Sequence, residues 1–577
     1  MRRAGHHGLL LGVVVALAVV GSIAAPRREA VQAGAASGVI QAPALPGAQP
    51  ISGRDRVYTA DQTSNTITVI NPATNDVLGT LDLGNERLDN LFSARYYREA
   101  NVHGLGFSPD GSLLDAISIT TNSAILVQTA TNTAKDAVYV GRAPHEGFVT
   151  PDGRELWVAV RGQNWVSVID LQQNQEVARI PTAAGPAMVV FSPDGQRAFV
   201  NHDRAPELLV IDVPSKQVLK RITGLDAGFS PNLEVTPDGK EVWLTHKNTG
   251  RVSVVDARAL ALLTVLDTGP VTNHVNFVAK HEGIYAYVTV GGLNKTLVFR
   301  TNGAHPEKVA EVSNAGYEPH GIWPSPDNTR VYVGLEKSDA VDVIDTDQQQ
   351  VIATVRIGQE PQALVYVANA VPDGDGRQNL KQQGLGKRIV TRDEAVPGTE
   401  GTVRVTVREV DTLDMIQVAA RGLSPTAHFS VYLSDGTVVQ AVRQFTSTAQ
   451  GTGDALAFTT FFGQFDRVVV LPEGTRPDPG LLHSVPVLEQ PAAPQPTPPA
   501  TPVIEQPHAP QLTPPATPVI EKPEAPQLTP PATPAIEQPA GTATGQGDGT
   551  VPQDHHPTVP DRGHPDQPVV EEAPAEE

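Results

Sequence analysis

Cysteine is absent from this 577-residue chain, which excludes disulfide bonds and thiolate metal ligands. Basic residues are also scarce: 43 lysines and arginines stand against 63 aspartates and glutamates, a formal net charge of −20. Nucleic-acid binding relies on clustered basic side chains that displace counterions from phosphates. We therefore predict no nucleic-acid partner. Without disulfides, the fold must be stabilised by packing and hydrogen bonds.

Long apolar runs are missing except at the N-terminus. There an arginine pair precedes an uncharged stretch, Gly8 to Ala25, that ends in small residues. This order is typical of an export signal, so residues 1–25 are predicted to be a signal peptide and 26–52 a linker. An uncleaved anchor is the alternative, and only then do we expect contact with a membrane. The protein is expected to be extracytoplasmic, either secreted or at the cell surface or in the periplasm.

A four-residue turn motif recurs through the first 330 residues. It consists of serine or threonine, proline, aspartate, and glycine or asparagine, which together favour a tight turn between two strands. The first four copies are spaced by 42, 42 and 44 residues, and the fifth follows after 89, so one copy has lost its signature near Ala279–Gly283. The five copies are Ser108–Gly111, Thr150–Gly153, Ser192–Gly195, Thr236–Gly239 and Ser325–Asn328.

Each period holds four short alternating strands, which is the content of one β-propeller blade. Six complete periods cover about 101–358. The stretch 53–84 carries three strands and Glu360–Val367 carries a lone one, so together they predict a seventh blade that closes the ring and covers both edge strands. The predicted fold is all-β, with a seven-bladed β-propeller over 53–370 in which the N- and C-terminal strands share one blade.

The repeat resembles a known family. Arg330–Val333, Asp339–Asp345 and Val351–Gly358 resemble the YVTN-type β-propeller repeat of surface-layer and extracytoplasmic proteins. The resemblance covers about 53–370 and is specific for the repeat. The relatives that it implies include envelope binding proteins and the propeller domains of nitrous oxide reductase and cytochrome cd1, and lactonases have similar rings. No tryptophan is followed by aspartate, which argues against WD40 repeats.

Histidines recur where the innermost strand of a blade begins. In blades aligned on the turn, four have histidine five residues before it, and two others have histidine at the end of the second strand. Innermost strands line the channel, and antiparallel pairing places these two positions side by side. We therefore predict that six histidines surround one mouth of the channel. They are His103, His145, His274 and His320 at the first position, and His202 and His246 at the second; Asp61, Arg161, Glu336 and Gln362 are expected at the same rim.

Three roles are open for these histidines. Each ring could simply bond a neighbouring backbone carbonyl as part of the turn. A subset such as His103 with His145, or His274 with His320, could hold copper, iron or zinc, since bonds of roughly 2.0–2.1 Å cannot span a wide channel. A small anionic ligand held by histidine and Arg161 is the third alternative.

The chain beyond the ring divides into three predicted parts. Residues 371–400 are expected to be a linker, and 401–485 a small β-sandwich-like domain without a chemical motif, interpreted as a stalk or adhesion-type module. Residues 486–577 contain three 16-residue proline-rich repeats and are predicted to be a disordered tail. A spacer that contacts cell-wall or envelope components and a solvated tail without a partner are the two interpretations.

Nothing in the sequence marks a catalytic nucleophile or a phosphate-binding loop. The aspartates that end one strand in several blades are predicted to cap turns: Asp170, Asp212, Asp256 and Asp345. The sequence favours an exported binding or scaffold module that contacts a protein or small ligand at the propeller rim, and no catalytic residue is assigned. The alternatives are a metalloprotein, redox-active or not, with a histidine-ligated copper, iron or zinc site at the channel mouth, and a lactonase-like hydrolase.

Overall fold

The computed structural model describes residues 49–83, 101–410, 413–435, 439–459 and 467–475, and all of them fall in one compact unit, Met1–Gln495. The predicted signal peptide and the proline-rich tail lie outside the described residues. The described part is built from strands, with a single 3-10 helix, η2 (Gly291–Leu293). It contains no helix long and apolar enough to cross a bilayer. The all-β prediction is confirmed.

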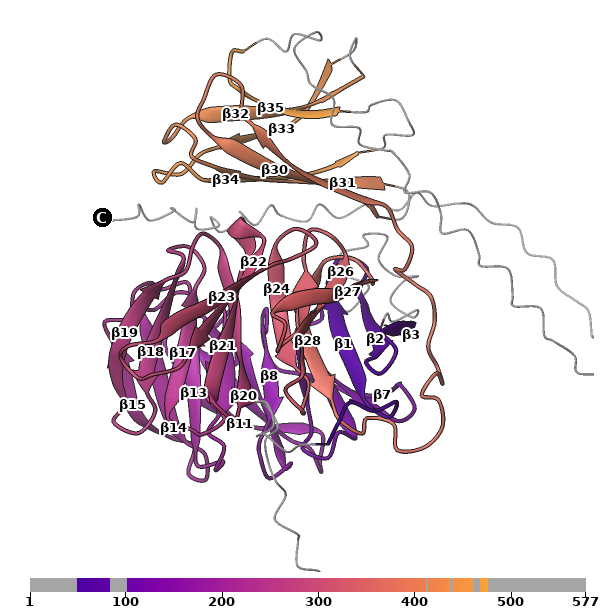
Figure 1. Cartoon of the computed structure of the whole chain (residues 1–577), viewed down its shortest axis with the longest axis vertical. Coiled ribbons are helices and arrows are strands. Elements are labelled where there is room, and N and C mark those ends of the chain that lie inside the picture. The colour runs from indigo at the N-terminus through magenta and orange to yellow at the C-terminus, as the bar shows by residue number, and fades with distance from the viewer. Residues whose placement is uncertain (1–48, 84–100, 411–412, 436–438, 460–466, 476–577) are drawn as a thin grey trace, which may run out of the picture. The chain divides into compact units, whose positions relative to one another are not determined.

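Seven four-stranded antiparallel sheets form the ring, and the first of them confirms the predicted closure. In this sheet, blade one, the order is β28-β1-β2-β3, and the register runs from Arg56 opposite Val367 to Asp61 opposite Pro361. Figure 1 shows the indigo β1 beside the orange β28. Strands from the two ends of the ring therefore share one sheet. They are β28 (Pro361–Val367), β1 (Arg56–Asp61), β2 (Thr66–Asn71) and β3 (Asp76–Asp82).

Blades two to four follow the predicted period. Blade two has β4 (Val102–Phe107), β5 (Leu113–Ser118), β6 (Ser123–Gln128) and β7 (Thr133–Tyr139). Blade three has β8 (Gly147–Val149), β9 (Glu155–Val160), β10 (Trp165–Asp170) and β11 (Gln175–Pro181). Blade four has β12 (Pro186–Phe191), β13 (Arg197–His202), β14 (Glu207–Asp212) and β15 (Gln217–Thr223).

Blades five to seven complete the ring. Blade five has β16 (Leu233–Val235), β17 (Glu241–His246), β18 (Arg251–Asp256) and β19 (Ala261–Asp267). Blade six has β20 (Thr272–Lys280), β21 (Gly283–Val290), β22 (Lys295–Arg300) and β23 (Glu307–Ser313). Blade seven has β24 (Pro319–Pro324), β25 (Arg330–Leu335), β26 (Ala340–Asp345) and β27 (Gln350–Arg356).

The recurring turn works as its sequence predicts. In blade two, Ser108 Oγ donates to Asp110 Oδ1 at 2.6 Å and accepts from the Leu113 amide, while Gly111 adopts φ 70°. Thr150 and Asp152 repeat the contact in blade three. Blade six, which lacks the motif, instead joins two long strands where Lys280 pairs with Gly283.

The predicted turn-capping aspartates are also confirmed. Asp170 Oδ1 accepts from the amides of Gln172 and Gln173, each at 2.8 Å, and Asp256 accepts from two amides in the same way. Asp212 and Asp345 cap the corresponding turns of their blades.

The second β domain has two sheets around its own core of valine, leucine and phenylalanine side chains. Its first strand, β29, lies inside the range predicted as a linker, so that prediction is wrong for 389–395; the alternating Ile389–Ala395 was overlooked beside glycine-rich sequence. One sheet has β29 (Ile389–Ala395), β30 (Thr402–Val410), β31 (Leu413–Arg421) and β34 (Gly453–Thr459). The other has β33 (Val439–Thr446), β32 (His428–Ser434) and β35 (Arg467–Pro472).

Candidate functional site

Four of the six predicted histidines come together as two pairs. The ring centroids of His103 and His145 lie 4.2 Å apart, and those of His274 and His320 lie 4.6 Å apart. All four residues are at most 6% exposed. Each pair comes from two consecutive blades, at or just before their innermost strands, so the packing of neighbouring blades brings these side chains together.

Two of these histidines make the backbone contact that was one of the open alternatives. His145 Nδ1 lies 2.8 Å from the carbonyl oxygen of Ala187, and His320 Nδ1 lies 3.1 Å from that of Gln362. In both cases the partner is the matching residue of the next blade, 42 positions on. Because a carbonyl only accepts, Nδ1 carries the proton in both rings, and Nε2 keeps its lone pair.

The other two histidines are not satisfied in this way. His103 Nδ1 and His274 Nε2 are buried without a hydrogen-bond partner. His274 also stands one position away from its predicted place. In the strand register, Asn276 of blade six matches Trp323 of blade seven, because they pair with Tyr287 and Tyr332. Three residues earlier in each strand, Asn273 matches His320. The alignment slipped because blade six has no turn motif to fix it.

A carboxyl group lies beside the pair formed by His103 and His145. Glu146 follows His145 directly, is 2% exposed, and has no partner for its Oε1 atom. One ligand atom from each of His103, His145 and Glu146 falls within a group whose members lie within 4.8 Å of one another. No other such group of three occurs among the residues that the structure describes. We call these three residues the mouth triad.

Charged side chains directly after the second strand surround the same mouth. Arg161 Nε lies 3.6 Å from Asp203 Oδ2, and Lys337 Nζ lies 2.6 Å from Glu336 Oε1. Lys247 occupies the matching position in blade five and acts electrostatically on His320 and Glu336. The predicted rim residues Arg161 and Glu336 are therefore at the mouth. Gln362 is buried, and its backbone carbonyl oxygen accepts the hydrogen bond from His320 Nδ1.

The mouth shifts the pKa values of its groups away from their ordinary values. Burial, reinforced by Arg161, lowers the pKa of His103 and of His145 well below the usual range, and burial lowers that of His320 to about 4. Burial raises the pKa of Glu146 to about 8, although Arg161 opposes the change. Burial would also raise the pKa of Glu336, but Lys337, Lys247 and His320 outweigh it and hold that pKa low. The imidazoles are therefore neutral at pH 7.

His202 and His246 do not belong to the mouth, which corrects their predicted position. His202 Nδ1 lies 3.1 Å from the Glu207 carbonyl oxygen, and His246 Nε2 lies 2.7 Å from Ser253 Oγ, so each bonds the third strand of its own blade. Asp61 occupies the same blade position and accepts from Thr68 Oγ1, seven residues later, the spacing that also separates His246 from Ser253. These side chains point into the blade because successive residues of a strand face opposite sides. Asp61, predicted at the rim, is likewise an interior residue.

Asp61 should make stability depend on pH. Burial raises its pKa to about 7, although hydroxyl donors, Thr68 first, oppose the change. The folded state then binds a proton that the unfolded state has lost, so stability falls as pH rises from about 4 to about 7, by as much as about 4 kcal/mol. Asp61→Asn should flatten this fall, as measured by urea unfolding at pH 5 and pH 8. An unchanged difference between the two pH values would contradict the assignment.

The second domain covers part of the mouth rather than standing free as a stalk. Arg408 of β30 is fully buried and donates from Nε to Asp339 Oδ1 at 2.9 Å. Arg404, four residues earlier, donates to the Gly291 carbonyl oxygen at 3.1 Å. Asp454 of β34 is near enough to Lys247 and Lys337 that both oppose the rise in pKa that burial causes there. The second domain thus contacts the ring beside the mouth.

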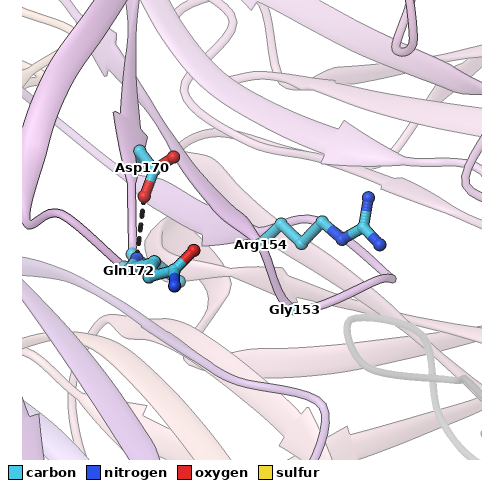
Figure 2. Close-up of a pocket in the computed structure, with 5 residues that line it drawn as sticks. Gly153, Arg154, Asp170 and Gln172 are labelled. Carbon is cyan, nitrogen blue, oxygen red and sulfur yellow. Dashed lines mark hydrogen bonds between the residues drawn. The ribbon is translucent and has the colours of Figure 1, made fainter. Parts of the chain in front are cut away.

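A separate hollow lies at the turns of blade three. It is lined by Gly153, Arg154, Asp170, Leu171 and Gln172, and Figure 2 shows Arg154 extending away from Asp170. Asp170 is used as a turn cap, so the hollow brings no free chemical group together. Arg154, exposed at this hollow, is a suitable control residue for substitutions at the mouth.

Sequence reasoning missed Glu146, Asp203 and Lys247. A signal was present for all three. Glu146 follows a predicted channel histidine, and Asp203 and Lys247 stand eleven residues after the start of their turns, as Arg161 and Glu336 do. Asp454 carried no comparable signal, because its place depends on how the second domain docks.

A closed seven-bladed ring with a buried polar cluster at one mouth defines the class of the chain, a seven-bladed β-propeller. The family described as "Lactonase, 7-bladed beta-propeller" matches residues 52–356. The chain belongs to this lactonase family.

Curated relatives match shorter stretches. Protein NirF of Stutzerimonas stutzeri is 25% identical over 167 residues, which are 26% of this chain and 42% of NirF. Protein YncE of Salmonella typhi is 31% identical over 94 residues, 16% of this chain and 26% of YncE. The chain thus spans less than half the length of either relative.

Solved structures match the chain at low identity. The periplasmic gluconolactonase PpgL of Pseudomonas aeruginosa is 20% identical with a TM-score of 0.43, covering 54% of this chain and 99% of PpgL. Hydrazine synthase of Kuenenia stuttgartiensis is 22% identical with a TM-score of 0.42, covering 46% of this chain and 89% of that one.

Proposed function

We propose that this protein hydrolyses a small lactone at the channel mouth. The observation that carries the proposal is the mouth triad: two neutral imidazoles and a carboxyl group gathered beside Arg161 in a ring of the lactonase family. Several titratable groups with shifted pKa values in one enclosed site are typical of catalysis. The sequence alone favoured a binding module, with a lactonase as the weaker alternative.

The groups present suit the reaction. Hydrolysis adds a water oxygen to the carbonyl carbon, breaks the ring carbon–oxygen bond, and gives a hydroxy acid whose carboxylate releases one proton. The water must lose a proton as it attacks, and the lone pairs of His103 and His145 lie at the mouth to accept it. The carboxyl of Glu146, protonated at pH 7, can donate a proton to the ring oxygen as its bond to the carbonyl carbon breaks. Arg161 would stabilise the negative charge that forms on the carbonyl oxygen.

The partial cover of the mouth by the second domain favours a small substrate. Arg404 and Arg408 hold the second domain against blades six and seven, and Gln359 Nε2 donates to the Glu409 carbonyl oxygen at 2.5 Å beside blade one. This leaves less of the rim open to a large protein partner. A monocyclic lactone and its hydroxy acid are small enough for a partly covered mouth, and Lys247 and Lys337 add positive charge for the acid.

The test is lactone turnover followed by pH-stat titration of the released proton. The untagged protein should hydrolyse at least one member of a panel of γ- and δ-lactones. Arg161→Met and Glu146→Gln should each lower kcat/KM by about 10²–10³-fold. The matched control is Arg154→Met in the same blade, where the arginine side chain is 83% exposed, and it should leave kcat/KM unchanged. Absence of turnover across the panel, or equal rates for the Arg161 and Arg154 variants, would refute the proposal.

We also propose that the protein works outside the cytoplasm, which the arginine pair and apolar run at its N-terminus support. Contact of the proline-rich tail with envelope components remains a proposal. Fractionation of cells that express the full chain would test both.

A further inference from the structure

We propose that the mouth triad is a binding site for one divalent transition-metal ion, zinc first. His103, His145 and Glu146 offer two imidazole nitrogens and one carboxylate oxygen within 4.8 Å of one another. Two histidines and one glutamate are a donor set that zinc accepts in catalytic sites, with a fourth position left for water. The inference rests on the proposed function in one respect only: it says how the cluster would activate the attacking water.

The unpaired atoms point to a ligand. Buried polar atoms are almost always hydrogen-bonded, yet His103 Nδ1 and Glu146 Oε1 have no partner while these residues are only 6% and 2% exposed. Leaving such atoms unpaired costs free energy, and an ion bound to both would remove that cost. No such explanation is needed for His145, whose Nδ1 is bonded already.

His145 has the arrangement expected of a metal ligand. Its Nδ1 donates to the Ala187 carbonyl oxygen at 2.8 Å, which fixes the tautomer and leaves the Nε2 lone pair available to an ion. Metal-bound histidines almost always donate their second nitrogen to such an acceptor. The blade-to-blade bond that first favoured a structural role therefore also prepares the ring for coordination.

The distances require only a small adjustment. Ligand bonds of about 2.0–2.2 Å place tetrahedral ligand atoms roughly 3.4 Å from one another. Contraction from 4.8 Å means side-chain movements of about 1 Å, which rotation of the Glu146 side chain can supply. Arg161 is held by Asp203, so its charge is partly compensated before an ion enters.

The second histidine pair provides a matched control. His274 and His320 are as close as the first pair, with ring centroids 4.6 Å apart, and are just as buried. They nevertheless form no three-membered group with a carboxylate in the described part of the chain. Two histidines without a third ligand should bind an ion far more weakly, so the sequence-predicted alternative site is expected to stay empty.

Isothermal titration of chelator-treated, untagged full-length protein with ZnCl2 tests the inference, with elemental analysis after gel filtration. Wild-type protein should bind one zinc ion that is lost in His103→Ala. Glu146→Gln should weaken binding by at least the ~10–100-fold typical of a lost outer-shell partner. His320→Ala should keep the ion. The tail histidines His555, His556 and His564 are present in every variant, so their contribution cancels.

Two results would overturn the site. One is equal zinc uptake by wild-type protein and the His103→Ala variant when circular dichroism shows that both are folded. The other is loss of the ion in His320→Ala to the same degree as in His103→Ala. Titrations with Fe2+ and Cu2+ distinguish zinc from the other metals. Because binding is measured without substrate, failure of the lactone assay would leave this result intact, and the reverse also holds.

Discussion

Arg408→Met should lower the free energy of unfolding by about 3–5 kcal/mol, the usual cost of removing one partner from a buried ion pair. Arg408 is fully buried, bonds Asp339 Oδ1 at 2.9 Å and donates to the Glu336 carbonyl oxygen. Methionine fills similar space but leaves Asp339, 2% exposed, without its countercharge. Urea unfolding of the full chain measures the effect.

Two controls separate lost charge from lost packing. Arg392→Met alters an exposed arginine on β29 of the same sheet and should stay within about 0.5 kcal/mol of wild type. Adding Asp339→Asn to Arg408→Met removes the unpaired carboxylate and should recover much of the loss. If Arg408→Met unfolds like Arg392→Met, the second domain is not held to the ring as described.

Tyr366→Ala should cost about 3–5 kcal/mol, as truncation of a large buried aromatic does. Tyr366 lies on β28, donates to Asp55 Oδ2 at 2.6 Å, and packs 5.7 Å from the ring of Tyr332. It joins the end of the ring to its beginning. In a closed ring, damage at this seam should weaken every blade together.

Tryptophan fluorescence makes this distinction visible. The four tryptophans stand at 157, 165, 243 and 323, in blades three, five and seven, and blade one has none. Tyr366→Ala should therefore shift the fluorescence transition in urea as far as Tyr332→Ala does, in step with circular dichroism. A separate early loss of circular dichroism with unmoved fluorescence would show that the seam opens independently.

The ring could be predicted because its signals are local and repeated. A proline-aspartate turn every 42 to 44 residues fixes the hairpins, and counting strands at both ends, 53–84 and Glu360–Val367, fixes the closure. Where the turn is missing, in blade six, the alignment slipped by one residue and misplaced His274. His274 nevertheless reaches the mouth, where its ring lies beside that of His320.

The site was harder to predict than the fold because successive residues of a strand face opposite sides of the sheet. His202 and His246 stand beside the mouth in register but face the interior of their blades, where Glu207 and Ser253 bond them. Glu146 was readable from its place after His145. The docking of Arg408 on Asp339, 69 residues away, follows from tertiary packing that no local pattern encodes.

We propose the mouth built on His103, His145, Glu146 and Arg161 as the place where this protein acts on small molecules. The most direct test is a crystal structure of the untagged protein soaked with 5-hydroxypentanoate, a hydroxy acid of the product class. We expect the carboxylate or hydroxyl of the acid against Arg161 and the mouth triad, and no density there in Glu146→Gln combined with Arg161→Met. Density only at His274 and His320, or at the opposite end of the channel, would contradict it.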